Sequence, residues 1–184
     1  MKRILVCVFS ETGNTMKVGE AIRDEAAKLD CSVDLKALAL FDPSSLGDYD
    51  VAFIGSTCHS SSLAQPVLDL LTKLPENKGL QVVGFVTHST WGPSKDAHRQ
   101  SLFARWAGNC QPAFETACAE KGVGFLGFFG CMGAPNPGIE TFIQNTIMPE
   151  AEEWEEYIEE ARKHPTDQDL LNARTFTREI LEIP

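Results

Sequence analysis

The sequence predicts an α/β protein in which helices cover both faces of a parallel sheet. Apolar runs typical of buried strands alternate with segments whose apolar residues recur every three or four positions, as in amphipathic helices. Five such strands, each followed by a helical or loop segment, indicate a parallel sheet. A chain of 184 residues is most simply one domain. We therefore expect a single domain over residues 1–184, with a helical extension from about residue 150.

The first half of the chain is expected to contain three strands and two helices. Residues 3–9 form a buried apolar run, residues 32–37 alternate between apolar and polar, and Val51–Ile54 is closed by Gly55. The second helix begins at Pro66, since proline has no N–H to lose in a first helical turn. The apolar positions with helical spacing are Val18, Ala21, Ile22, Ala26 and Leu29, and then Val67, Leu70, Leu71 and Leu74.

The second half is expected to contain two strands, at 81–86 and 124–129, with a helical stretch between them. Pro112 falls inside that stretch, which predicts a kink or a split into two helices. An acidic helical region begins at Ile139, and residues 164–167 separate it from a last amphipathic helix. The apolar face of the helical stretch consists of Phe103, Trp106, Cys110, Ala113, Phe114 and Ala117. The last helix carries Leu170, Leu171, Ala173, Phe176, Ile180 and Leu181.

Three loops that follow predicted strands are rich in hydroxyl groups: 10–15, 56–64 and 87–95. In parallel α/β sheets, ligands bind beyond the carboxyl ends of the strands, near the point where the strand order reverses. All three loops belong to that edge of the predicted sheet. The sequence therefore predicts a ligand site formed by these loops.

The first of these loops, Ser10–Thr15, has the composition of an anion site. Backbone N–H groups at the start of a helix are unpaired, and the helix dipole favours a negative charge there. Gly13 allows close approach of the backbone, and Ser10, Thr12 and Thr15 carry hydroxyl donors. The loop has no Lys or Arg and lacks the GxxxxGK[ST] and GxGxxG patterns, which favours a monophosphate. The alternative is a helix-capping turn with a surplus of hydroxyls.

At this loop the sequence resembles the flavodoxins. Their phosphate loop follows the first strand with the pattern S/T-x-T-G-x-T, and the order of elements agrees from residue 3 to about 164. The resemblance implies a flavodoxin-like three-layer sandwich with five parallel strands in the order 2-1-3-4-5. It also implies a phosphate site for flavin mononucleotide (FMN). The matching residues are Ser10, Glu11, Thr12, Gly13, Asn14 and Thr15.

The resemblance assigns the second loop, with Thr57, Cys58, His59 and Ser60, to the flavin ring. His59 stands where many flavodoxins place an aromatic residue, although an exposed loop histidine is the alternative. Ser60 stands where many have a glycine whose peptide flips when the flavin is reduced. Serine adopts a positive φ at a greater cost than glycine. This departure disfavours the stable neutral semiquinone that the resemblance would otherwise imply.

The third loop is implied to supply backbone bonds to the flavin pyrimidine edge through Thr87, His88 and Ser89. Trp91 is the candidate for covering the outer face of the ring, because a flat indole can bury a flavin. Two alternatives remain open. Trp91 packs the loop onto the domain, and His88 forms a bond within the loop.

The six cysteines form no CxxC pair, and no His/Cys cluster has zinc spacing, so no metal site is expected. Cys131, in the stretch 129–138, is interpreted as a buried thiol in a tight turn. The alternative is a redox thiol near the flavin, together with Cys58. The sequence has no apolar segment of signal-peptide or membrane-spanning length, which predicts a cytoplasmic protein with reduced thiols.

The formal net charge of -10 argues against nucleic-acid binding and suits redox partners with basic docking surfaces. With FMN and no catalytic residues expected, the primary hypothesis is a low-potential electron carrier. One alternative is an NAD(P)H-dependent quinone or flavin reductase on the same fold, and another is a binding module without flavin. The C-terminal helical segments either cover the sheet or form a dimer face, so the protein is expected to be either a monomer or a homodimer. Their large apolar residues include Trp154, Tyr157, Phe176 and Ile180.

Overall fold

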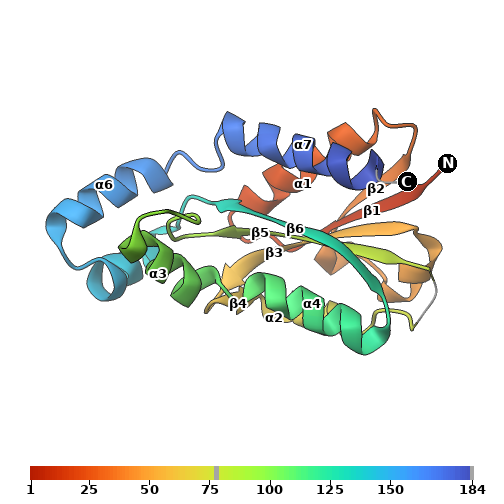
Figure 1. Ribbon diagram of the computed structural model, residues 1–184, viewed down its shortest axis with the longest axis horizontal. Helices are drawn as coiled ribbons and strands as arrows, with labels where there is room; N and C mark the ends of the chain where they lie inside the picture. Colours follow the sequence, from red (N-terminus) through yellow and green to blue (C-terminus); the bar gives the residue numbers. More distant parts are fainter. Residues whose placement is uncertain (77–78, 183–184) are drawn as a thin grey trace.

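The computed structural model describes residues 1–76 and 79–182, which form a parallel sheet between two helical layers (Figure 1). The expected domain 1–184 also includes residues 77–78 and 183–184, which lie outside the described residues. Across the sheet the strand order is β2-β1-β3-β5-β6. The parallel strands are β1 (Arg3–Val8), β2 (Ser32–Ala37), β3 (Val51–His59), β5 (Gln81–His88) and β6 (Gly124–Met132). Counted along the chain, this order is 2-1-3-4-5, and the predicted fold class is confirmed.

Helices α1 and α7 cover one face of the sheet, and α2 and α4 cover the other (Figure 1). Along β1, Ile4 and Val6 belong to the core under α1 and α7, whereas Leu5 belongs to the core on the opposite face. This alternation follows from the two-residue period of a strand. The helices are α1 (Asn14–Ala26), α2 (Gln65–Leu71), α3 (Ala97–Ala107), α4 (Cys110–Lys121), α5 (Pro137–Phe142), α6 (Ala151–Ala161) and α7 (Asp167–Glu182). Shorter turns are η1 (Leu38–Leu40), η2 (Pro43–Asp48) and the π-helical η3 (Ile143–Ile147).

The helical stretch between β5 and β6 is split, as expected, but the break precedes Pro112. Helix α3 ends at Ala107 and α4 begins at Cys110, so Pro112 lies in the first turn of α4, where a missing N–H costs little. The fully buried Phe114 of α4 packs directly on the sheet. A Cβ at Gly84 would stand 2.5 Å from the Phe114 ring, so this glycine sets how closely α4 approaches β5.

Helix α7 belongs to the sandwich itself, because it lies against α1 and β6. The rings of Phe176 and Phe129 are 5.8 Å apart, and Arg178 donates to the Glu25 carboxylate, whose side chain is 3% exposed. Of the two roles considered for the C-terminal segments, α7 covers the sheet. Helix α6 instead packs beyond the end of the sheet, and the helix expected from Ile139 onward is interrupted between η3 and α6.

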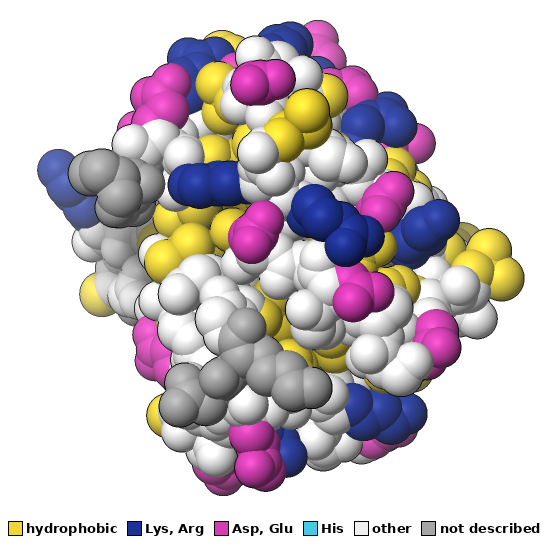
Figure 2. All heavy atoms as spheres, turned by 90° about the vertical axis from the view of Figure 1, so that its right-hand side faces the viewer, with side chains coloured by type: hydrophobic (Ala, Val, Ile, Leu, Met, Phe, Trp, Pro, Cys, Tyr) yellow, Lys and Arg dark blue, Asp and Glu magenta, His cyan; other side chains and the backbone are white. Residues whose placement is uncertain are grey.

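The two ends of the sheet differ in character. Figure 2 faces the end where β1 starts, and there Lys and Arg side chains are interspersed with Asp and Glu. The hydroxyl-rich loops lie at the other end, where the parallel strands finish. None of the described helices combines the length and apolarity that crossing a membrane requires.

Candidate functional site

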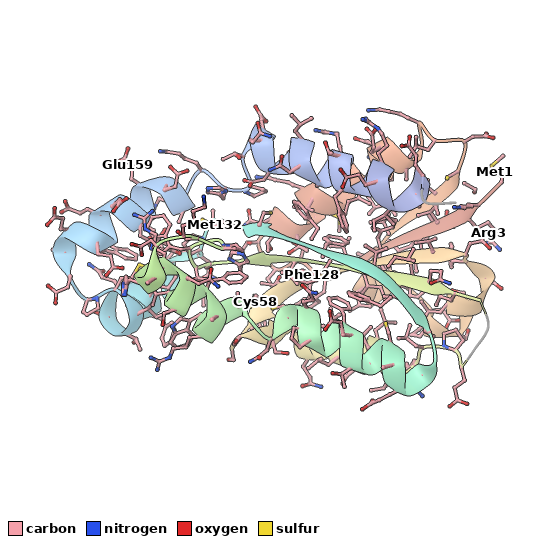
Figure 3. All side chains as sticks on the ribbon, in the orientation of Figure 1. Met1, Arg3, Cys58, Phe128, Met132 and Glu159 are labelled. Carbon is pink, nitrogen blue, oxygen red and sulfur yellow. The ribbon has the colours of Figure 1, made fainter. Side chains whose placement is uncertain are left out.

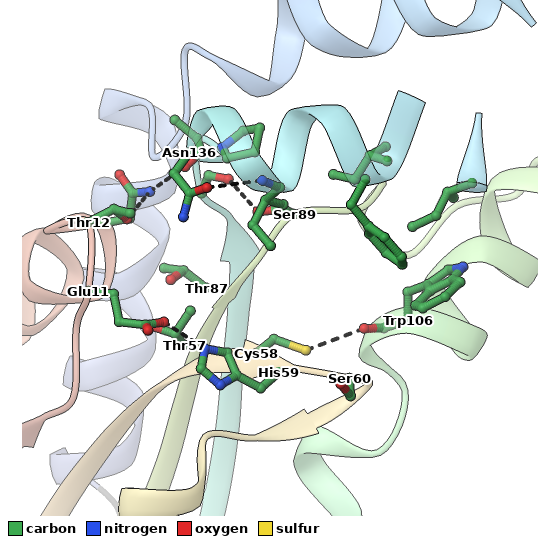
Figure 4. A pocket seen from close by; sticks show the side chains of 18 residues that line it. Glu11, Thr12, Thr57, Cys58, His59, Ser60, Thr87, Ser89, Trp106 and Asn136 are labelled. Atoms are coloured by element: carbon green, nitrogen blue, oxygen red, sulfur yellow. Dashed lines mark hydrogen bonds and ion pairs between the residues drawn. The ribbon is translucent and has the colours of Figure 1, made fainter. Parts of the chain in front are cut away.

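A pocket of about 470 Å³ lies at the carboxyl ends of β1, β3, β5 and β6 (Figure 4). Its volume is typical of a small-molecule or cofactor site. Strand-end loops form one wall, while α3, α5 and η3 form the other. The lining residues are Glu11, Thr12, Asn14, Thr57, Cys58, His59, Ser60, Thr87, Ser89, Trp106, Gly133, Ala134, Pro135, Asn136, Ile139, Phe142, Ile143 and Ile147.

The loop before α1 has the geometry of an anion site. Gly13 adopts a left-handed φ of 87° and leads directly into α1, and in this described segment no side chain caps the helix at that position. The Ser10 hydroxyl accepts a hydrogen bond at 3.3 Å from the N–H of Met16, in the first turn of α1. With the Met16 N–H bonded to Ser10, the N–H groups of Asn14 and Thr15 at the start of α1 face a negatively charged ligand best. Thr12 and Asn14 line the pocket beside them.

Ser10, Gly13 and Thr15 shape this loop but do not line the pocket. Thr15 is buried, and its hydroxyl lies 2.7 Å from that of Thr87 and 3.5 Å from that of Thr57. These contacts join α1 to the ends of β5 and β3. The expectation that Thr15 donates to a ligand is therefore corrected, because its hydroxyl is bonded inside the protein.

The residues after β6 close the pocket on one side, and they were not predicted as site residues. Asn14 Nδ2 donates to the Ala134 carbonyl at 2.8 Å and to Thr12 Oγ1 at 3.0 Å. A Cβ at Gly133 would stand 3.1 Å from Thr87 Cβ and 3.2 Å from Asn14 Cβ, so glycine permits this close contact. Asn136 caps α5 by accepting from the Ile139 N–H at 3.0 Å. The Gly- and Pro-rich composition of residues 130–138 was the sequence feature that could have indicated a loop at the pocket.

The second loop is a tight hairpin between β3 and β4 (Ser62–Leu63), in which His59 pairs with Ser62. The short antiparallel strand β4 was not predicted. Ser60 and Ser61 have φ values of 47° and 72°, so both adopt the left-handed conformation that two-residue hairpins require. His59 is about half exposed, and its Nε2 lies 2.6 Å from Glu11 Oε2 at the rim of the pocket (Figure 4).

The third loop divides between the pocket and the interior. Thr87 and Ser89 line the pocket, whereas the intervening His88 is buried, as the two-residue period of a strand dictates. His88 Nδ1 lies 3.2 Å from the Thr90 carbonyl, so the bond within the loop is the alternative that the structure shows. Burial lowers the pKa of His88 to about 4, which keeps the ring neutral.

Trp91 also lies outside the pocket, which corrects the expectation that it covers a flavin. It is 7% exposed and packs edge-on against Tyr157, with 5.4 Å between ring centroids. The guanidinium of Arg99 lies 3.9 Å from the centroid of the Trp91 ring. Trp91 therefore packs its loop onto α3 and α6, which was the alternative considered.

A different aromatic pair borders the pocket. Trp106 of α3 and Phe142 of α5 meet edge-on, with centroids 5.7 Å apart. Phe142 and Ile139 are 43% and 41% exposed, so this wall is apolar and open to solvent. Trp106 lies on the continuous apolar face that the sequence predicts for the helical stretch between β5 and β6. Helical spacing alone does not distinguish a core position from a pocket wall.

The chemistry of the lining fits a ligand with an anionic end and a flat apolar end. Hydroxyl groups and the helix start lie at one side, and the aromatic wall lies at the other (Figure 4). Cys131 is buried and its pKa is raised to about 12 by burial, which confirms the interpretation as a buried thiol. Within residues 1–76 and 79–182, no group of three His, Cys, Asp or Glu residues is placed to hold a metal ion.

A doubly wound parallel sheet with such a pocket at the carboxyl ends of its strands defines an α/β protein of the nucleotide-cofactor type. The sequence matches the flavodoxin domain over residues 5–178, and the chain belongs to the flavodoxin family, whose members bind a flavin. A comparison with curated protein sequences gives no match.

Solved structures with the same fold include several flavodoxins. Oxidised flavodoxin 1 from Bacillus cereus has a TM-score of 0.64 and 12% identity, and the match covers 99% of both chains. A flavodoxin from the domain Archaea has a TM-score of 0.62 and 15% identity, covering 98% of this chain and 96% of the other. A WrbA-like flavodoxin from Agrobacterium tumefaciens has a TM-score of 0.54 and 11% identity, covering 98% and 95%. At these identities the likeness shows the fold.

Proposed function

We propose that this protein binds FMN in the pocket and carries single electrons between redox proteins. The observation that supports this most is the phosphate-type loop before α1, joined to an aromatic wall in one pocket. FMN itself would supply the redox chemistry, which the protein positions and tunes.

Each part of the pocket has a role in this proposal. The first N–H groups of α1 and the Thr12 hydroxyl would hold the phosphate with neutral donors. Trp106 and Phe142 would border the ring and exclude water from one side of it. Thr87 and Ser89 lie at the end of β5, where polar groups would face the pyrimidine edge. Because none of the described lining residues is Lys or Arg, the phosphate would be bound without an ion pair.

The charge of the chain supports a carrier with basic partners. A net charge of -10 disfavours the anionic hydroquinone and so favours a low potential. The same charge would steer basic redox proteins toward this molecule over distances of about 10 Å at 0.1 M salt. Oligomeric state and a cytoplasmic location stay predictions.

The second candidate is an NAD(P)H-dependent quinone or flavin reductase. Exposed Ile139 and Phe142 at the pocket rim favour it, because apolar rim surface is available to a flat second substrate. The two candidates differ in how the flavin is reduced, which makes them separable in one assay.

The test begins by mixing the purified protein with FMN and with riboflavin. We expect one FMN per chain and weaker binding of riboflavin, whereas equal affinity would remove the phosphate site. Stopped-flow reduction by NADPH alone is then compared with reduction through a basic reductase across a salt series. Slow direct reduction and salt-sensitive reduction through the reductase support the carrier. Rapid turnover of NADPH with a quinone, insensitive to salt, would establish the reductase instead.

A further inference from the structure

Two cysteines distant in sequence meet beside the pocket. Cys58 lies next to the last residue of β3, Cys110 is the first residue of α4, and their sulfur atoms are 3.3 Å apart. Figure 3 labels Cys58 near the junction of α3 and α4, and Figure 4 shows its side chain in the pocket wall. A disulfide joins sulfurs at about 2.05 Å, so an approach of roughly 1 Å would allow a bond.

The surrounding hydrogen bonds hold the two cysteines together. At the hairpin turn, the Ser61 carbonyl accepts from the Asn109 N–H at 3.0 Å, and Asn109 Nδ2 donates to Ser61 Oγ at 3.2 Å. The Cys58 thiol donates to the Trp106 carbonyl at 3.3 Å. The β3–β4 hairpin is thus fixed to the α3–α4 junction on both sides of the sulfur pair.

The two thiols differ in accessibility and in acidity. Cys58 lines the pocket and is partly exposed, whereas Cys110 is completely buried. The hydrogen bond from the Cys110 thiol lowers the pKa of Cys58 against the opposing effect of burial. The same bond, together with burial, raises the pKa of Cys110. The Cys58 S–H also donates to the Trp106 carbonyl in the last turn of α3, and this contact favours the thiol form. An accessible, acidified thiol with a buried neighbour is the arrangement of an attacking and a resolving cysteine.

We propose that Cys58 and Cys110 form a reversible dithiol–disulfide pair in the wall of this pocket, with a hydroperoxide as the oxidant. The Cys58 thiolate attacks a peroxide oxygen, so an S–O bond forms, the O–O bond breaks and hydroxide leaves as water after protonation. Cys110 then loses its proton and attacks the sulfenic sulfur, so the S–S bond forms, the S–O bond breaks and a second water leaves. Two thiols thereby lose two electrons, and hydrogen peroxide is reduced to two waters. A dithiol reductant then exchanges with the disulfide, is itself oxidised to a disulfide, and returns Cys58 and Cys110 to thiols.

Oxidation would also alter the pocket. The disulfide removes the Cys58 S–H that bonds to the Trp106 carbonyl, so the redox state of the pair is coupled to the helix that carries the aromatic wall. The pair itself does not depend on a bound flavin, so it is testable in the flavin-free chain.

The first experiment treats flavin-free protein with hydrogen peroxide, blocks free thiols and maps disulfides by mass spectrometry. Trypsin releases Cys58 on residues 37–73, and both Cys110 and Cys118 on residues 106–121. The matched control is therefore Cys118→Ser. We expect the two peptides to be linked in the wild type and in Cys118→Ser, separated by dithiothreitol, and unlinked in Cys58→Ser and Cys110→Ser. Absence of the link in wild type, or its persistence in Cys110→Ser, would overturn the proposal.

The second experiment measures the acidity of Cys58 through its alkylation rate at pH 7. Cys110→Ala removes the hydrogen-bond donor, and we expect Cys58 to react several-fold more slowly with iodoacetamide than in Cys118→Ser. Circular dichroism verifies that both variants are folded, and Cys110→Val, which also lacks a donor, serves in place of Cys110→Ala if the latter is not. An unchanged rate in the folded variant would contradict the proposed activation of Cys58.

Discussion

The polar wall of the pocket comes from the carboxyl ends of three strands, with Thr57 near the end of β3, Thr87 near the end of β5 and Thr12 in the loop after β1. The aromatic wall comes from two separate helices, which carry Trp106 and Phe142. The polar wall is determined by strand pairing alone, because parallel strands bring their carboxyl ends to the same edge of the sheet. The aromatic wall exists only after α3 and α5 have packed. The hydroxyl-rich loops in the sequence therefore locate the pocket, but the packing of the helices determines that Trp106 and Phe142 form its aromatic wall.

The two tryptophans give the sharpest test of this comparison. Trp106→Ala should weaken FMN binding by about 2–4 kcal/mol, as for other large aromatic anchors in binding sites. The matched control Trp91→Phe should leave FMN affinity nearly unchanged, because Trp91 packs against Tyr157. Titration of FMN fluorescence measures both. If Trp91→Phe weakens FMN binding as much as Trp106→Ala does, the aromatic wall has been assigned to the wrong residue.

His88 lies between the pocket-lining residues Thr87 and Ser89, but its own side chain is buried. Its titration tests that burial. Its pKa is about 4 when folded, below the ordinary value of 6.5, because burial penalises the charged ring. The unfolded chain therefore binds the proton first as pH falls. The contribution of neutral His88 to the free energy of unfolding is therefore fully present above about pH 6.5. About 3 kcal/mol of it is lost as the pH falls to 4.

Urea unfolding at several pH values measures this effect in wild type and in His88→Gln. The carboxylates titrate in both proteins, so the difference between the two isolates the histidine. We expect the difference in unfolding free energy between the proteins to shrink as pH falls from 7 to 4. A constant difference would show that His88 is not buried as a neutral ring.

Thr12 tests the polar wall. Thr12→Ala should weaken FMN binding by roughly 1–3 kcal/mol, the cost of leaving a polar contact unmade. Riboflavin lacks the phosphate, so its affinity should be the same for Thr12→Ala and wild type. Parallel titrations with both flavins separate loss of a phosphate contact from a general disturbance of the pocket, in which both affinities would fall together.

The hairpin at the edge of the polar wall gives the smallest expected effect. Ser60 has a φ of 47°, a conformation that costs a non-glycine residue energy. Ser60→Gly should raise the free energy of unfolding by about 0.5–1 kcal/mol after the greater flexibility of unfolded glycine is included. Ser62→Gly is the control, because Ser62 lies in β4 and glycine there should destabilise. Thermal unfolding that ranks the two variants in the opposite order would contradict the assigned turn.

The sequence predicted the fold and the polar wall because both depend on short-range patterns. Apolar runs and hydroxyl-rich loops place Thr12, Thr57 and Thr87 without knowledge of any tertiary contact. Trp91 was misassigned because its loop reaches the pocket edge but its ring turns toward α6, and only the position of Tyr157 decides that orientation. The meeting of Cys58 and Cys110 was missed for the same reason, since 52 residues separate them.

The docking of α7 onto α1 also has a consequence during synthesis of the chain. The core under these helices includes strands β1 and β3, made early, and Ala173 and Ile180, made late. The buried Glu25 carboxylate likewise gains its hydrogen bond from Arg178 only after the C-terminal part of the chain has been made. On the ribosome, only α1 would cover that face of the sheet until α7 has emerged, so nascent chains stalled before residue 167 should bind chaperones that capture apolar surface.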